Sequence, residues 1–355
     1  MDDWKNRIHQ GDAFQVLKGL PDESVHCIIT SPPYYNQRDY TSDEQIGLEQ
    51  TPEDYIDKLI EVFRESRRVL RHDGTLWINI GDSYNKNSGH SQERNNDAEN
   101  IHKNNNYISS FAIKPKDLIG VPWMLAFALR HDGWWLRQDI IWKKLNCMPE
   151  SVKNRCTKTH EYIFLLAKSQ NYYYDYYAIK EPVSETSLKR AEYGWDCERP
   201  STKNSSFNGD GIHVEKMGKR FVDESGRNKR SVWEVSTKSY KEAHFATFNT
   251  ELITPCILAG TSSKGCCSKC GTPFNRIIID AQTDWQQGCD CKDMTVVPCV
   301  VMDPFMGSGT TAEAATINMR DYVGIELNPE YVKLARKRME GGNKGGFETS
   351  MFASI

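Results

Sequence analysis

Short apolar runs recur along this chain and predict buried strands. Three of them, Val25–Ile29, Leu76–Ile80 and Trp134–Trp142, are rich in β-branched and aromatic residues and are bounded by turn-forming residues. His160–Leu166 and Val300–Met302 have the same character. Strands of this kind, separated by segments with helical spacing, predict an α/β fold with one sizeable core.

Two of the intervening segments carry clear helix signals. Thr51 is a capping residue, Pro52 occupies the first turn, and two acidic residues follow. Apolar side chains then recur at helical spacing, and Gly74 is expected to end this helix. Val121–His131 repeats the pattern, and a short strand and helix are expected within residues 8–20.

The first apolar run ends in a rigid turn. Pro32 and Pro33 fix their own φ angles, donate no backbone N–H and restrict the residue before them. The result is a stiff corner with free carbonyls, flanked by the hydroxyl of Ser31 and the ring of Tyr34. Such a corner suits an enzyme that holds a flat ring by its face and an amino group by its hydrogens. A proline turn that merely closes a strand is the alternative.

A glycine-rich loop follows the strand near the C-terminus. Asp303 stands at the strand tip, and a helix is expected to begin near Thr310, so backbone N–H groups are free to meet a ligand. Glu326 follows the next strand, about 20 residues on, where an acid can hold ribose hydroxyls. Residues 307–312 also fit the loose dinucleotide fingerprint of dehydrogenases. The acid before the loop suits a cationic ligand better than a pyrophosphate and argues against that alternative.

Four cysteines have the spacing of a metal site. Cys267-x-x-Cys270-Gly is typical of a zinc knuckle, and Cys289-x-Cys291 can supply the second pair of thiolates. A site closed by four thiolates has no open coordination position, so the predicted zinc is structural. Free reduced cysteines are the alternative, with Cys266 as a substitute ligand.

Composition and charge narrow the class of protein. The chain has 355 residues, of which 38% are hydrophobic, enough for a core with appended modules. Its formal net charge is −3, so a nucleic-acid surface would have to be a local basic face. The sequence has no apolar segment suited to secretion or to spanning a membrane, and a cytoplasmic location without membrane attachment is expected.

Together the two motifs resemble those of the amino-methylating DNA methyltransferases that use S-adenosylmethionine. Ser-Pro-Pro-Tyr at residues 31–34 resembles their catalytic motif, and Asp-Pro-Phe-x-Gly-Ser-Gly-Thr-Thr at residues 303–311 resembles their cofactor loop. Catalytic motif first is the permuted order of the family's β group, and the resemblance covers residues 11–338. It implies a circularly permuted Rossmann-like α/β methyltransferase fold, here with a recognition insert and a small zinc-bound insert.

The resemblance also implies the site residues. The expected catalytic residues are Ser31, Pro32, Pro33 and Tyr34. The expected cofactor-binding residues are Asp12, Asp303, Phe305, Gly307, Gly309, Thr310, Thr311 and Glu326. Asp12 would contact the adenine of the cofactor, although it also suits a helix N-cap. The implied substrate is double-stranded DNA, with a cognate restriction endonuclease as a candidate partner.

The identity of the methylated base depends on Ser31. Family members with serine at this position are mostly cytosine-N4 enzymes, whereas aspartate is usual for adenine-N6 enzymes. Both bases have a ring-nitrogen acceptor beside the amino group, so adenine remains the alternative, and RNA or protein amino groups are more remote ones. Attack on the ring by a cysteine would need a Pro-Cys turn, which the motif lacks.

The expected organisation has six parts. A basic and aromatic stretch between the two motifs is the expected target-recognition region, although acidic residues dilute its charge. The parts are a catalytic half at 1–180, the recognition region at 181–241, a return to the methyltransferase domain at 242–261, the zinc insert at 262–295, the S-adenosylmethionine-binding half at 296–340 and a tail at 341–355.

Overall fold

The computed structural model describes residues 4–36, 45–85, 113–186, 225–239, 246–247, 249–279 and 282–342. The chain forms two compact units. Residues 1–175 and 231–355 make up the first unit, and residues 176–230 make up the second. No helix within the described ranges is long and apolar enough to cross a bilayer.

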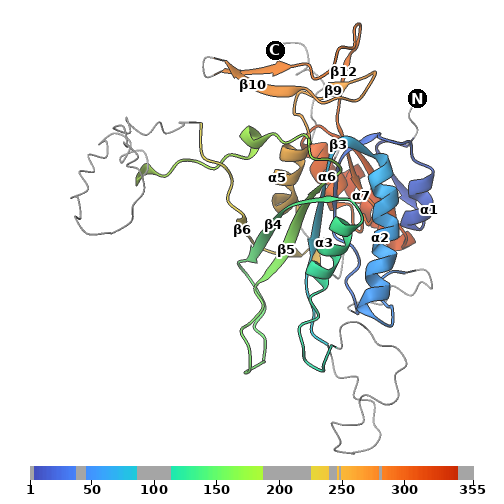
Figure 1. The fold of residues 1–355 in the computed structure, drawn as a ribbon, viewed down its shortest axis with the longest axis vertical. Helices are drawn as coiled ribbons and strands as arrows, with labels where there is room; N and C mark the ends of the chain where they lie inside the picture. Colours follow the sequence, from blue (N-terminus) through green and yellow to red (C-terminus); the bar gives the residue numbers. More distant parts are fainter. Residues whose placement is uncertain are drawn as a thin grey trace, which may run out of the picture. The chain divides into compact units, whose positions relative to one another are not determined.

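An eight-stranded mixed sheet forms the centre of the first unit (Figure 1). Its strand order is β1-β14-β13-β2-β3-β5-β4-β6, and only β5 runs against its neighbours. The strands are β1 (Arg7–Gln10), β2 (Val25–Thr30), β3 (Leu70–Ile80), β4 (Trp135–Lys144), β5 (His160–Ala167), β6 (Val232–Val235), β13 (Val300–Asp303) and β14 (Asp321–Glu326). All six residues of β2 are buried, as its apolar run predicts.

The order of the strands brings the two ends of the chain together. β13 and β14, from the end of the chain, lie between β1 and β2, from its beginning. β2 and β13 are parallel neighbours, with Cys27 opposite Val301. Because parallel strands end at the same edge of a sheet, the residues that follow β2 and β13 meet there.

The helices form two groups that cover the sheet (Figure 1). α1 packs on α2 and α2 on α3, whereas α5 packs on α6 and α6 on α7. Their bounds are α1 (Ala13–Lys18), α2 (Pro52–Val69), α3 (Val121–His131), α5 (Thr250–Gly260), α6 (Thr310–Ile317) and α7 (Pro329–Gly342), with a 3-10 turn, η2, at Tyr176–Ile179. α2 begins as its sequence predicts, since the Thr51 hydroxyl accepts a hydrogen bond from the Asp54 N–H at 3.1 Å.

The predicted end of α2 at Gly74 is wrong. The helix ends at Val69, and Leu70 already belongs to β3. Leu70 fits the helical spacing of apolar residues, but its fully buried side chain belongs to the strand. A buried apolar residue is expected on the inner face of a helix and in a central strand alike. Local spacing therefore could not distinguish the last turn of the helix from the first residue of the strand.

Shorter strands lie outside the large sheet. In the segment before β13, β9 (Cys266–Cys267) pairs with β12 (Val296–Val297), and β10 (Asn275–Ile279) pairs with β11 (Gln282–Gln286). β7 (Lys238–Ser239) pairs with β8 (Ala246–Thr247). β10 contains the isoleucine run of the expected zinc insert.

The expected recognition region at 181–241 is divided in the structure. Val232–Val235 forms β6 and pairs with β4, so this part belongs to the large sheet of the first unit. In the second unit, Arg230 and Arg227 pair with the carboxylate of Glu181 at 2.9 and 3.4 Å. Residues 187–224, which include Lys216, Lys219 and Arg220 of the basic stretch, lie outside the described residues.

Candidate active site and cysteine cluster

The Ser-Pro-Pro-Tyr turn follows directly from β2 and is held at several points. The Tyr55 hydroxyl, on α2, donates to the Pro33 carbonyl at 2.7 Å. Pro32 is buried, while Ser31 and Tyr34 are half-buried. The Tyr34 hydroxyl donates to Glu161 Oε2 at 2.8 Å. The turn is therefore a fixed corner at the carboxyl edge of the sheet.

One side chain joins this turn to the glycine-rich loop. The Thr30 hydroxyl, at the last position of β2, donates to Asp303 Oδ1 at 2.6 Å. Asp303 is the last residue of β13 and is completely buried. The structure thus brings together the two motifs that the sequence separates by more than half of the chain. Thr30 was not among the expected site residues.

Asp303 is a buried acid that organises the loop. Its carboxylate also accepts from the Thr311 hydroxyl at 2.7 Å and from the Phe305 N–H at 3.0 Å. Burial raises the pKa of Asp303 from 3.8 to about 6, against the lowering effect of hydrogen bonds from Thr30, Thr311 and Phe305. The carboxylate is therefore ionised at neutral pH and places a negative charge beneath the loop.

The remaining expected cofactor residues surround the same loop. Glu326 Oε2 accepts from the Gly307 N–H at 2.8 Å, and burial raises the pKa of Glu326. Gly309 has φ +87° and caps α6. Phe305 is half-buried against Phe63, with ring centroids 6.5 Å apart. Thr310, the first residue of α6, is buried, and its hydroxyl accepts from Arg338 at 2.9 Å.

Asp12 lies at the same edge and caps a helix. Its carboxylate accepts from the Gln15 N–H at 3.0 Å, which makes it the N-cap of α1. The preceding residue, Gly11, donates its N–H to the Glu326 carbonyl at 3.0 Å. Asp12 therefore acts as the N-cap, which was the alternative role expected for it. The Gly11 contact also brings Asp12 near Glu326, the acid that ends β14. An adenine contact by Asp12 stays a prediction.

Gly307 leaves open space beside the loop. It has φ +55°, and a Cβ built on it would meet no atom within 4 Å. We expect Gly307→Ala to cost about 1–2 kcal/mol of folding free energy through backbone strain alone. If the space holds a ligand, the methyl group should also lower affinity for S-adenosylmethionine by about tenfold or more, measured by calorimetry. The matched control is Gly133→Ala, at φ +95° after α3, where a Cβ would likewise meet nothing. Equal affinities in both variants would contradict a ligand at Gly307.

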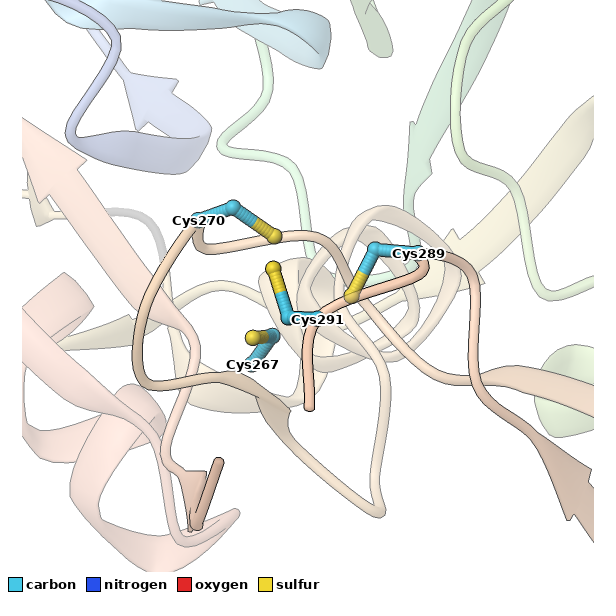
Figure 2. A group of neighbouring side chains, drawn as sticks. All are labelled: Cys267, Cys270, Cys289 and Cys291. Carbon is cyan, nitrogen blue, oxygen red and sulfur yellow. The ribbon is translucent and has the colours of Figure 1, made fainter. Parts of the chain in front are cut away.

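The four cysteines with metal-site spacing meet in one cluster. The four sulfurs all lie within 4.8 Å of one another, and Figure 2 shows the side chains converging: Cys267, Cys270, Cys289 and Cys291. The Lys269 N–H donates to the Cys267 sulfur at 3.4 Å, as in turns that hold a thiolate. Four sulfurs so placed match the donor set and number that Zn²⁺ prefers.

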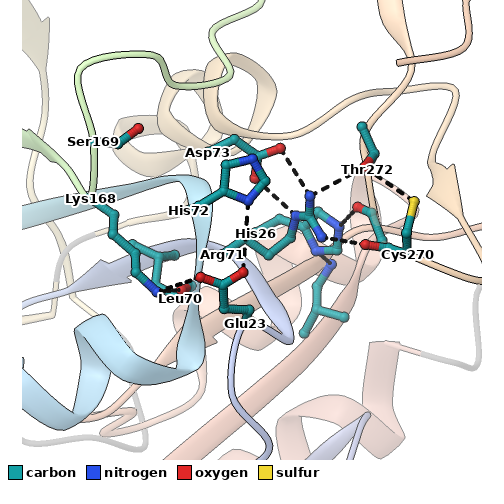
Figure 3. A network of polar contacts seen from close by, with 12 residues as sticks. Glu23, His26, Leu70, Arg71, His72, Asp73, Lys168, Ser169, Cys270 and Thr272 are labelled. Carbon is teal, nitrogen blue, oxygen red and sulfur yellow. Dashed lines mark hydrogen bonds and ion pairs between the residues drawn. The ribbon is translucent and has the colours of Figure 1, made fainter. Parts of the chain in front are cut away.

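The turn of this cluster is bound to the large sheet (Figure 3). The Arg71 guanidinium, on β3, donates to the Cys270 carbonyl at 2.6 Å and pairs with both oxygens of Asp73 at 2.9 and 3.0 Å. His26 Nε2, on β2, lies 2.8 Å from the Gly271 carbonyl. Two backbone carbonyls of the turn are thus held by two neighbouring strands.

A second group, His26, Cys266 and Cys299, is buried, but its hydrogen bonds argue against a metal. His26 Nδ1 accepts from the Val300 N–H at 3.0 Å while Nε2 faces the Gly271 carbonyl, so neither nitrogen offers a lone pair. The Cys266 sulfur lies 3.5 Å from the Val297 carbonyl. Cys266 therefore belongs to this group and not to the four-cysteine cluster.

Sequence reasoning missed several polar residues around the turn and the loop. Glu161 and Asn79 come from β5 and β3 and could not be connected to Tyr34 without the sheet register. Ser308, within the loop, is 2% exposed, and its hydroxyl has no hydrogen-bond partner in the described part of the chain. Ser308 lies inside the cofactor-loop motif, but it was not among the expected site residues.

Sequence comparison finds the same family over most of the chain. Residues 25–337 match a family model described as DNA methylase, for N6 and N4 enzymes. The chain is 42% identical to the Type II methyltransferase M.Cfr9I of Citrobacter freundii, over 94% of this chain and 87% of that protein. It is 40% identical to the Type II methyltransferase M.SmaI of Serratia marcescens, over 94% and 90%.

Solved structures share the fold. The PvuII DNA methyltransferase, described as cytosine-N4-specific, superposes with a TM-score of 0.55 at 15% identity, covering 95% of this chain and 89% of that one. TTHA0409 of Thermus thermophilus, a putative DNA modification methylase solved with S-adenosyl-L-methionine, gives 0.51 at 22% identity, covering 96% and 97%. The predicted α/β methyltransferase fold is confirmed. By its sequence the chain belongs to the DNA methylase family of amino-methylating DNA methyltransferases.

Proposed function

We propose that this protein transfers a methyl group from S-adenosylmethionine to N4 of a cytosine in duplex DNA. The observation that carries the proposal is the 2.6 Å hydrogen bond between Thr30 and Asp303. It joins the end of the strand before the Ser-Pro-Pro-Tyr turn to the first residue of the glycine-rich loop. A group bound at the loop would therefore lie beside a base held at the turn.

The residues of the loop suit S-adenosylmethionine. The cofactor supplies a methyl group bound to a positively charged sulfur. The buried negative charge of Asp303 favours a cation nearby, and the open space beside Gly307 gives room for close approach to the backbone. Glu326, at the end of β14, suits ribose hydroxyls.

The turn is suited to hold an amino group. The amino nitrogen of a nucleobase is a weak nucleophile because its lone pair is delocalised into the ring. Hydrogen bonds from the amino group to the Ser31 hydroxyl and the Pro32 carbonyl would turn the lone pair toward the methyl group, while Tyr34 stacks on the ring. The base has to leave the duplex to reach this turn, at a cost of a few kcal/mol. Rate enhancement then comes from positioning, without a covalent enzyme intermediate.

Cytosine is favoured over adenine because of Ser31. Its hydroxyl can accept a hydrogen from the amino group, and family members with serine at this position are mostly cytosine-N4 enzymes. Adenine N6 is the alternative, since its ring also offers a nitrogen acceptor beside the amino group. RNA and protein amino groups are more remote alternatives.

Product analysis tests the proposal directly. We expect labelled methyl from S-adenosylmethionine to appear in duplex DNA, and nucleoside digestion with mass spectrometry to identify N4-methylcytosine. N6-methyladenine would overturn the choice of base and keep the chemistry. Labelling of RNA or protein but of no duplex, across a library of varied sequences, would overturn the proposed substrate. Ser31→Asp is a useful companion variant, because a shift toward adenine would connect base choice to this position.

A structural zinc ion is the second part of the proposal. The four convergent sulfurs of residues 267–291 support one tetrahedral site without an open position. Residues 181–241 are proposed to contact the target sequence, and a cognate restriction endonuclease is a candidate partner. The two Type II relatives named above favour that partner. The cytoplasmic location stays a prediction.

A further inference from the structure

The carboxylate of Glu161 is largely buried and hydrogen-bonded to Tyr34 of the Ser-Pro-Pro-Tyr turn. Glu161, the second residue of β5, accepts from the Tyr34 hydroxyl at 2.8 Å and from the Asn79 side-chain amide at 3.2 Å. Its other oxygen pairs with the ammonium of Lys144, the last residue of β4. Three donors from three different segments therefore converge on one acid beside Tyr34.

We infer that Glu161 is a positioning residue for methyl transfer, which holds the Tyr34 ring in the orientation needed to stack on the target base. This inference rests on the proposed function, because stacking on a base is the role given there to Tyr34. It adds a residue more than a hundred positions away from the motif. Glu161 acts through Tyr34 and does not touch the base.

The burial of Glu161 supports an indirect role. Its side chain is only 13% exposed, and three donors already bond to it. A base stacked on Tyr34 would meet the face of the ring, whereas Glu161 holds the hydroxyl at its edge. The carboxylate thus restricts the ring without occupying the space in which the base would lie.

Gly81 completes the seat of the ring. A Cβ at this position would lie 2.9 Å from Tyr34 Cε2 and 3.2 Å from the carboxyl carbon of Glu161. Both side chains therefore pack closely on the backbone just after β3. A ring fixed by backbone on one edge and by a charged hydrogen bond at its hydroxyl has little freedom to rotate.

The charge of Glu161 also suits the reaction. Burial and the negative charge of Glu161 raise the pKa of Tyr34 well above its usual value, so the phenol stays a proton donor. A phenol that donates to a carboxylate has a more electron-rich ring. The target nitrogen gains positive charge as the methyl group is transferred, and an aromatic face attracts positive charge. The arrangement should therefore favour the transition state more than base binding.

A double-mutant cycle tests this role in single-turnover methyl transfer. We expect Tyr34→Phe and Glu161→Gln each to slow transfer roughly tenfold or more, with affinity for S-adenosylmethionine within about twofold of wild type. Because Glu161 acts through the hydroxyl, the double variant should be about as slow as the slower single variant. Multiplicative losses would show that Glu161 acts independently of Tyr34, and an unchanged Glu161→Gln rate would overturn the inference.

Two further variants separate positioning from loss of folding. Glu161→Gln removes the carboxylate that pairs with the Lys144 ammonium, so Glu161→Gln with Lys144→Gln removes both charges and protects the fold. This pair should still be slow. Asp132→Asn is the matched control, because the Asp132 side chain is 15% exposed, pairs with Arg64 at 2.6 Å just after α3, and has no role in the proposed site. It should transfer methyl at the wild-type rate.

A fluorine label at Tyr34 provides a readout that needs no activity. With 3-fluorotyrosine at this position, we expect one sharp ¹⁹F resonance in the wild type and a shifted or broadened one in Glu161→Gln. An identical resonance in both would overturn the inference even if no DNA were methylated. If the wild type methylates no duplex but the resonance still differs in Glu161→Gln, the proposed function is wrong, whereas the conclusion that Glu161 fixes the Tyr34 ring holds.

Discussion

Asp303→Asn is expected to weaken binding of S-adenosylmethionine by at least about tenfold, or about 1.4 kcal/mol, at neutral pH. Asparagine has nearly the same shape as aspartate. Its oxygen can keep the bonds from Thr30 and from the Phe305 N–H, while its amide can donate to the Thr311 hydroxyl. The variant therefore removes the charge and leaves the loop in place. Calorimetric titration of the purified protein measures the loss.

Adenosine and a second variant identify the cause of that loss. Adenosine lacks both the sulfonium and the amino-acid ammonium, so its affinity, measured by competition, should be the same in Asp303→Asn as in wild type. Asp321→Asn is the control for a strand acid, since Asp321 lies at the opposite end of the neighbouring strand and bonds Asn6 at 2.9 Å. A parallel loss for adenosine would mean that the loop collapsed, and an unchanged affinity for S-adenosylmethionine would remove Asp303 from the site.

The raised pKa of Asp303 predicts opposite pH trends for binding and for stability. Its pKa rises from 3.8 to about 6 on folding, so the folded chain holds a proton more tightly than the unfolded chain. This contribution to stability is present below pH 4 and is lost as the pH rises through 6, at a cost of about 3 kcal/mol. Asp303→Asn should remove that dependence in denaturant unfolding at pH 5 and 7.5. Binding by the wild type should instead strengthen as the pH rises through 6.

The sequence predicted the strands and the motifs well because both are local. β2 and β13 are short apolar runs ended by prolines or glycines, and one sheet buries both of them. The cysteine spacing likewise restricts where four sulfurs can lie, and the four gather as expected. The residues that connect these parts were not predictable, because they depend on strand order. Thr30 meets Asp303 only because β13 lies beside β2.

The roles of single acids were also hard to derive from sequence. Asp303 and Glu326 were expected to face a ligand, and in the structure each accepts a hydrogen bond from the backbone of the glycine-rich loop, at Phe305 and Gly307 respectively. Asp12 caps α1, a role its residue type suits as well as it suits ligand contact. An acid beside a glycine turn can contact a ligand or cap the backbone, and only its burial and hydrogen-bond partners distinguish these roles. Burial and hydrogen-bond partners cannot be read from the sequence.

Removal of the proposed zinc is expected to unfold the cysteine-rich insert. Structural zinc contributes about 10–16 kcal/mol in small zinc-finger peptides, and a thiolate cluster without its ion would repel itself. We expect Cys291→Ser to reduce bound zinc from one ion per chain to nearly none. Limited proteolysis should then cut within residues 268–295, while the large sheet stays protected. Metal analysis and mass spectrometry of the fragments measure both effects.

A matched cysteine variant separates zinc loss from loss of any thiol. Cys147→Ser changes a half-exposed cysteine that lies outside the cluster, and it should keep the zinc and the protease resistance of the wild type. If Cys291→Ser bound a full equivalent of zinc, Cys291 would not be a ligand. If the wild type bound no zinc and its insert still resisted protease, the four sulfurs would be ordinary thiols.

The contacts of the Cys267–Gly271 turn predict how far the effect of losing zinc extends into the large sheet. His26 joins the Gly271 carbonyl to the Val300 N–H, so the turn is tied to the first residues of β2 and β13. The candidate active site lies at the opposite ends of these strands. Loss of zinc should therefore reduce affinity for S-adenosylmethionine less than Asp303→Asn does.

Arg71→Lys, which keeps the charge but loses the forked hydrogen bonds, should make the insert more susceptible to proteolysis while the insert retains its zinc. If either change abolished methyl transfer in a folded chain, the zinc site would be part of the catalytic machinery.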